Sequence, residues 1–72
     1  MLYGTVKSYE RARGYGTLLA DSGEEFPVHY TQIMMDGYRK LEPGQRVKFE
    51  TVSTRKGITA INVFILQAND SI

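Results

Sequence analysis

Hydrophobic and polar residues alternate along most of this chain, so that every second residue is apolar over short stretches. This period of two is typical of half-buried β-strands, whose side chains point alternately to the two faces of a sheet. In the first stretch Val6 is expected to face inward and Lys7 to face solvent. The inward positions of the other stretches include Leu18, Ala20, Phe26, Val28, Val47 and Phe49. The pattern predicts strands at residues 2–7, 15–20, 25–29, 46–53 and 58–66.

Turn signals separate these stretches, at residues 21–23, 42–45 and 54–57. Residues 31–35 are expected to form one helical turn, and residues 38–45 a long polar connection. Pro27 interrupts the third strand, since proline cannot donate a ladder hydrogen bond. Either its nitrogen points away from the neighbouring strand, or the pairing there is irregular. Five short strands, divided three and two by the long connection, predict an all-β chain folded as a small barrel.

The length and composition agree with a compact β-domain. The chain has 72 residues and no cysteine, so it should form one domain with a small core and no disulfide. A closed β-architecture removes exposed strand edges. No apolar run is long enough to span a membrane, and the first residues lack the features of a signal peptide. We therefore expect a cytoplasmic protein without a membrane partner, in which residues 1–66 form the domain and 67–72 a C-terminal tail.

The inventory of reactive side chains argues against an enzyme. His29 is the one histidine, and no pairing of a serine nucleophile with a base is supported. Glu24 and Glu25 are adjacent, and adjacent side chains in a strand point to opposite faces, so they do not form an acid–base pair. No spacing of ligands suits a metal. We expect no catalytic residue, no metal site and no cofactor.

Basic, aromatic and glycine residues gather in residues 7–18. In an extended strand Tyr15 and Thr17 share one face, and Gly14 and Gly16 take the other. A sheet face with rings and cations, beside glycines that let a ligand come close, suits stacked bases and phosphates. The alternative is an ordinary half-buried hairpin with surface tyrosines, because tyrosine favours strands anyway. The net charge of +1 is low for a protein that binds through phosphate contacts alone.

Two motifs carry a resemblance to a known family. Arg-Gly-Tyr-Gly-Thr-Leu at 13–18 resembles the first ribonucleoprotein motif of the bacterial cold-shock proteins, Lys-Gly-Phe-Gly-Phe-Ile. Phe-Pro-Val-His-Tyr at 26–30 resembles their second motif, Val-Phe-Val-His-Phe. Residues 4–7, 36–38, 41–47 and 60–63 are similar to further segments of the family. The resemblance covers residues 2–63 and identifies the chain as a divergent member.

The resemblance implies a five-stranded antiparallel Greek-key barrel, the OB-fold, that binds single-stranded RNA or DNA. A bulge would aim the residue at position 8 outward, and Tyr9 would be partly buried. The protein would act as an RNA chaperone or as a regulator of transcription or translation in a bacterial cytoplasm. The positions expected to contact nucleic acid are Lys7, Tyr9, Arg13, Tyr15, His29, Tyr30, Tyr38, Arg55 and Lys56.

Three positions of the family's aromatic platform carry no aromatic ring here. Ser8 stands where the family has Trp, and Thr17 and Pro27 stand where it has Phe. Each lost stacking ring costs about 1–3 kcal/mol of binding free energy. The barrel should therefore be kept while binding is weakened or exchanged for another role. The alternative function is a degenerate barrel that acts as a protein-interaction or self-association module.

The sequence leaves two interpretations open for several residues. The apolar run Val-Phe-Ile-Leu at 63–66 is either a last strand buried on both faces or an edge that pairs with a second copy, giving a homodimer. Tyr9 and Tyr30 either contact ligand or close the barrel. His29 is either a ligand contact or an ordinary surface residue.

Overall fold

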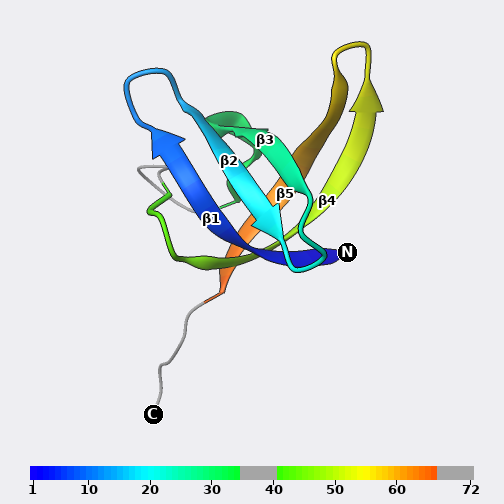
Figure 1. The fold of residues 1–72 in the computed structure, drawn as a ribbon. Helices are drawn as coiled ribbons and strands as arrows, with labels where there is room; N and C mark the ends of the chain where they lie inside the picture. Colours follow the sequence, from blue (N-terminus) through cyan, green and yellow to red (C-terminus); the bar gives the residue numbers. More distant parts are fainter. Residues whose placement is uncertain (35–40, 67–72) are drawn as a thin grey trace.

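The computed structural model describes residues 1–34 and 41–66, which form a small barrel (Figure 1). Its elements are β1 (Leu2–Glu10), β2 (Tyr15–Ala20), β3 (Glu25–His29), a 3-10 turn η1 (Tyr30–Gln32), β4 (Arg46–Thr54) and β5 (Gly57–Leu66). The strands β2 and β3 have the predicted bounds, whereas β1 is three residues longer and β4 and β5 are each one residue longer. The predicted helical turn is η1, which begins one residue early. Residue 35 of the predicted helical turn and residues 38–40 of the predicted connection lie outside the described part of the chain.

The strands close in the order β1–β2–β3–β5–β4, and β4 pairs back to β1. This confirms the five-stranded all-β barrel expected from the sequence. Four of the five pairs are antiparallel, but β3 and β5 run parallel where Val28 meets Ala60. The predicted antiparallel Greek-key barrel thus contains one parallel junction, between β3 and β5. A closed ring with an odd number of strands cannot alternate direction throughout, so one junction has to be parallel.

The barrel interior is apolar. Every position that the alternation placed inward is buried, and Ile33, Leu41, Ala60 and Val63 complete the core. The rings of Phe26 and Phe49 meet edge to face with centroids 5.9 Å apart. Within residues 1–34 and 41–66 no polar or charged residue is buried. The core is thus held by hydrophobic burial and shape, without internal polar groups that would need partners.

Pro27 fits into β3 without disturbing the pairing with β2. It lies opposite Thr17 in an unbroken antiparallel register. Its carbonyl accepts a hydrogen bond from the Thr59 hydroxyl of β5, at 3.0 Å. In a strand the nitrogen and the carbonyl of one residue face the same neighbour. The missing donor of Pro27 therefore faces β5 and points away from β2, which leaves the ladder with β2 unbroken.

The end of β5 is shaped by a bulge at Asn62. Asn62 has a positive φ of 50°, a conformation that asparagine adopts more readily than most residues, and the register with β4 shifts here. Beyond the bulge the Val63 side chain lies in the core, while Phe64 is 37% exposed. The centroid of the Phe64 ring lies 5.6 Å from the Lys48 Nζ. Burial of the apolar run on both faces is therefore wrong for Phe64. Pairing of this strand with a second copy stays a prediction.

A bidentate ion pair links the turn after β2 to the start of β4. The Arg46 guanidinium donates to both carboxylate oxygens of Asp21, at 2.8 and 3.1 Å. It also donates to the Thr5 hydroxyl at 3.3 Å. The hydrogen bonds from Arg46 lower the pKa of Asp21 from its ordinary value, and this pairing raises the pKa of Arg46. The pair thus joins two segments that lie far apart in the chain, at the surface of the barrel.

We expect Asp21→Asn to lower the melting temperature slightly at neutral pH. The pKa of Asp21 is depressed in the folded state, so the stabilisation is present above the unfolded pKa and is lost as the pH falls through the folded one. The difference from the wild type should therefore shrink as the pH falls below about 4, the ordinary pKa of an aspartate. Thermal unfolding followed by circular dichroism measures it, with Glu24→Gln in the same turn as the charge-matched control. An Asp21→Asn difference that persists in acid would contradict this role.

Candidate functional site

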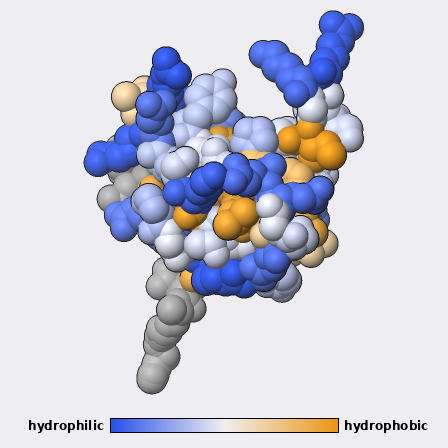
Figure 2. All heavy atoms as spheres, in the orientation of Figure 1, coloured by the Kyte–Doolittle hydropathy of each residue, from blue (hydrophilic) through white to orange (hydrophobic). Residues whose placement is uncertain are grey.

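The exposed face of β1, β2 and β3 carries two rows of side chains that run across the strands. One row is Ser8, Thr17 and Pro27, and the next is Glu10, Tyr15 and His29. The rows align because the register of β1 against β2 shifts between Val6 and Ser8. This is the bulge that the family resemblance implied, and Ser8 is exposed as expected. Figure 2 views the molecule from this side and shows hydrophilic atoms projecting at the tips of the β1–β2 and β4–β5 hairpins.

Three aromatic rings meet at one end of this face. Tyr15 and His29 stand edge to face with centroids 4.9 Å apart, and His29 and Tyr30 are tilted with centroids 4.7 Å apart. Tyr15 is 54% exposed and Tyr30 is 43% exposed. Rings that touch one another and still present this much surface to solvent form a platform on which a flat ligand can stack. We call Tyr15, His29 and Tyr30 the ring cluster.

The orientation of His29 is fixed from η1. Its Nδ1 accepts a long hydrogen bond from the Thr31 backbone N–H, at 3.4 Å, and lies 2.9 Å from the Thr31 hydroxyl. His29 is thereby the N-cap of the short turn that follows β3. Because Nδ1 accepts from a backbone donor, the neutral ring carries its proton on Nε2. The same contact that begins η1 therefore holds the central ring of the cluster.

The two glycines of the first motif are covered by the protein's own rings. A Cβ on Gly14 would lie 2.6 Å from Cδ1 of Tyr30, and Gly14 has a φ of +71°. A Cβ on Gly16 would lie 2.7 Å from Cδ1 of Tyr9 and 2.7 Å from the Ser8 carbonyl oxygen. The expectation that these glycines open space for a ligand is therefore wrong. They open space for Tyr30 and Tyr9, because a side chain at either glycine would push these rings away.

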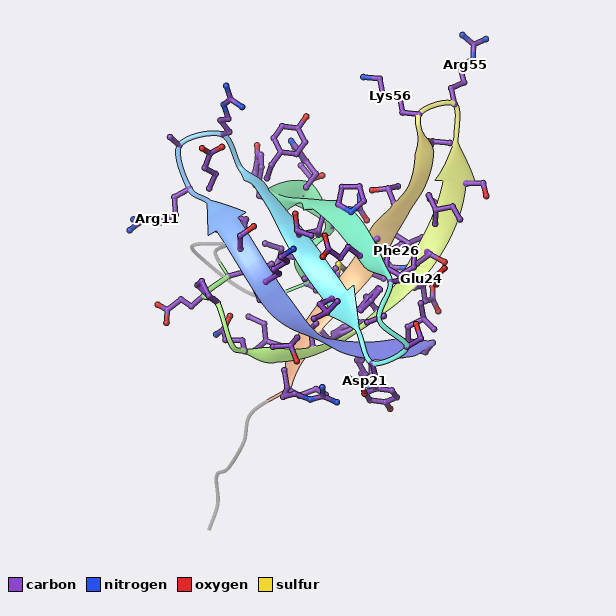
Figure 3. The ribbon with its side chains drawn as sticks, in the orientation of Figure 1. Arg11, Asp21, Glu24, Phe26, Arg55 and Lys56 are labelled. Atoms are coloured by element: carbon purple, nitrogen blue, oxygen red, sulfur yellow. The ribbon has the colours of Figure 1, made fainter. Side chains whose placement is uncertain are left out.

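The cations predicted for the site lie at three separate places. The Lys7 ammonium pairs with the Glu25 carboxylate of β3 at 2.6 Å. Arg13, in the turn after β1, has its Nε 3.7 Å from Glu10. Arg55 and Lys56 extend from the tip of the β4–β5 hairpin, which projects beyond the barrel (Figure 3). The structure therefore gathers Lys7 and the ring cluster on one face and leaves Arg55 and Lys56 on a separate arm.

The remaining predicted contacts differ in position. Tyr9 is half-buried and packs against the core, so it lies under the face more than on it. Tyr38 lies outside the described residues. The same face also carries two carboxylates that were not predicted there, Glu10 and Glu25. The signal for Glu10 was available, because a bulge at position 8 reverses the alternation and turns residue 10 outward.

An open hollow lies beside Tyr15, where the family's tryptophan would stand. Its volume is about 330 Å³, and its lining residues are Ser8, Tyr9, Glu10, Tyr15, Gly16 and Thr17. The small side chain of Ser8 leaves this space open. The lining combines two tyrosine rings, of which Tyr15 is the exposed one, with the hydroxyls of Ser8 and Thr17 and the Glu10 carboxylate. A site with these groups can stack a flat ligand and hydrogen-bond to its edge.

Comparison with known proteins places the geometry in a family. The model of the 'Cold-shock' DNA-binding domain matches residues 2–66. The chain belongs to the cold-shock domain family. This family consists of nucleic-acid-binding proteins and not of enzymes, which agrees at the family level with the absence of a catalytic arrangement in the sequence. No helix within residues 1–34 and 41–66 is long and apolar enough to cross a lipid bilayer.

Relatives of the same size support this assignment. The chain is 44% identical over 64 residues to the cold shock-like protein CspA of Stigmatella aurantiaca, covering 88% of this chain and 94% of that protein. It is 41% identical over 63 residues to the cold shock protein CspD of Bacillus subtilis, covering 88% of this chain and 96% of that protein. Among solved structures, drosophila Unr CSD456 is similar with a TM-score of 0.77 and 21% identity, over 99% of this chain and 29% of that one. That structural likeness concerns the cold-shock barrel fold.

We expect Gly16→Ala to lower the free energy of unfolding by about 1–3 kcal/mol, because the new methyl group overpacks the contact with Tyr9 and the β1 backbone. Urea denaturation followed by circular dichroism measures the loss. Thr17→Val is the control. Thr17 is the next residue of β2 and its side chain points to the opposite face, so this change should alter the free energy of unfolding by about 0.5 kcal/mol or less. If Gly16→Ala were as stable as the wild type, Tyr9 would not be packed on Gly16.

Proposed function

We propose that this protein binds single-stranded RNA or DNA by stacking bases on the ring cluster, and thereby keeps the strand unpaired. The observation that carries the proposal is the contact series Tyr15–His29–Tyr30, whose two tyrosines are about half exposed on the outer sheet face. Every base has a π-face, so such stacking depends only weakly on sequence. We further propose that Tyr38, together with Arg13, Arg55 and Lys56, contributes at the border of this face.

The charges suit a strand that runs along the face. A phosphate can replace Glu25 as the partner of Lys7, since their ion pair is exposed and such pairs contribute little stability. The hairpin that carries Arg55 and Lys56 can hold a further part of the backbone. A protein of this kind acts passively, as an RNA chaperone or as a regulator of transcription or translation. We place this activity in a bacterial cytoplasm, by analogy with the bacterial relatives.

Titration with a short labelled oligothymidylate, followed by fluorescence anisotropy, tests the proposal. We expect saturable binding whose log affinity falls with log salt by about 0.7 per phosphate contacted. Tyr15→Ala should weaken binding about 5- to 100-fold, because it removes one stacking ring. Tyr3→Ala is the matched control, since Tyr3 is 48% exposed but pairs with Lys48 on another part of the barrel. Absence of binding at low salt, or equal losses in both variants, would reject the proposal.

A second candidate is a barrel that has exchanged nucleic acid for a protein partner or a second copy of itself. The observation in its favour is the lack of an aromatic ring at Ser8, Thr17 and Pro27, which form a whole row of the face. Under this alternative the wild type binds the oligonucleotide hardly at all, and the double variant Ser8→Trp, Thr17→Phe creates binding. Under the main proposal the wild type already binds and the double variant strengthens it by about 10-fold or more. Light scattering at high concentration tests the predicted homodimer through the C-terminal strand.

A further inference from the structure

The hollow beside Tyr15 holds a carboxylate in a place where a nucleic-acid site would be expected to avoid one. Glu10 lies directly opposite Tyr15 across β1 and β2, and His29 lies opposite Tyr15 on the other side, across β2 and β3. The Tyr15 ring is therefore flanked by a histidine on one side and a carboxylate on the other. Directly opposite residues have Cβ atoms about 5 Å apart. A base stacked on Tyr15 thus has its edge within reach of Glu10.

The Glu10 carboxylate is free to change partners. Among the described residues it forms an ion pair with Arg13, whose Nε lies 3.7 Å from the carboxylate, and both side chains are more than two-thirds exposed. Such a pair contributes little free energy. An ionised carboxylate has only acceptors, so it can bind only to donor groups of a ligand. Towards a phosphate it is repulsive. Glu10 therefore weakens binding of a strand unless a base presents donors to it.

The Watson–Crick edges of the bases differ in the donors that they offer. Guanine has two adjacent donors, N1–H and the N2 amino group, which match the two oxygens of one carboxylate. Cytosine and adenine offer one amino group beside an acceptor nitrogen. Uracil and thymine offer a single N3–H between two carbonyl oxygens, and these oxygens repel a carboxylate. Bases that are unstacked from a strand are commonly read on this edge.

The rest of the hollow complements the same base. Ser8 and Thr17 lie opposite one another in the row next to Glu10 and Tyr15. Their hydroxyl groups can donate to the O6 acceptor of guanine. The volume of about 330 Å³ is at the lower end of the range for small-molecule pockets. From these contacts we infer that Glu10 makes this protein select guanine over thymine or uracil at the base that stacks on Tyr15. This inference rests on the proposed function.

The test compares a short oligothymidylate with strands of equal length that carry one guanine, adenine or cytosine at the central position. A single guanine avoids association between strands. Affinities are measured by anisotropy for the wild type, Glu10→Gln and the charge-matched control Glu24→Gln. The wild type should prefer the guanine strand over oligothymidylate by about 10-fold, the effect of one good bidentate contact.

Glu10→Gln should remove this preference. A glutamine amide offers an NH2 donor group and a carbonyl acceptor, which match the O4 and N3–H of thymine as well as the O6 and N1–H of guanine. Glu24→Gln should keep the wild-type order of strands. Equal affinity of the wild type for all strands, or a uniform gain in Glu10→Gln, would overturn the inference and leave the proposed function intact. If no strand binds at low salt, the proposed function and the inference both fail.

Discussion

The register shift between Val6 and Ser8 decides which side chains reach the outer face of the barrel. Before the shift Gly4 and Val6 face inward, and regular alternation would send Ser8 inward after them. The bulge leaves Lys7 and Ser8 both exposed and turns Tyr9 toward the core. The contacts that the end of β1 makes on this face follow from this irregularity, because it sets Ser8 and Glu10 beside Thr17 and Tyr15.

The same region shows that the two sequence motifs are one structural unit. Gly14 of the first motif has a bare Cα under the Tyr30 ring of the second, and its carbonyl accepts a hydrogen bond from the Tyr30 N–H at 2.8 Å. Gly16 makes the corresponding space for Tyr9. The glycines therefore set where the rings stand. Under the proposed function, stability and binding are coupled here, since a side chain at either glycine displaces a ring.

The sequence predicted the fold well and the site only in part. Alternation found the inward residues because burial leaves a periodic hydrophobic trace, and each of Val6, Leu18 and Phe49 is buried. The alternation did not predict the last residues of β1 and β4 or the first residue of β5. There the strand pairing continues through mostly exposed residues, which leave no periodic hydrophobic pattern. Tyr15 and His29 could be assigned to one face by parity. The pair Lys7–Glu25 could not, because it joins β1 to β3 across β2 and depends on the three-dimensional path of both strands.

The charges on this face affect contacts with phosphates and contacts with bases differently. Lys7 is neutralised by Glu25, and Arg13 lies near Glu10, so the strands that carry the rings present little net positive charge. The net charge of the whole chain, +1, is low in the same way. A phosphate that reaches Lys7 has to displace a carboxylate at 2.6 Å, whereas a base that stacks on Tyr15 displaces only solvent from a ring that is 54% exposed. Under the proposed function, contacts with bases therefore contribute more to binding on this face than attraction of phosphates does.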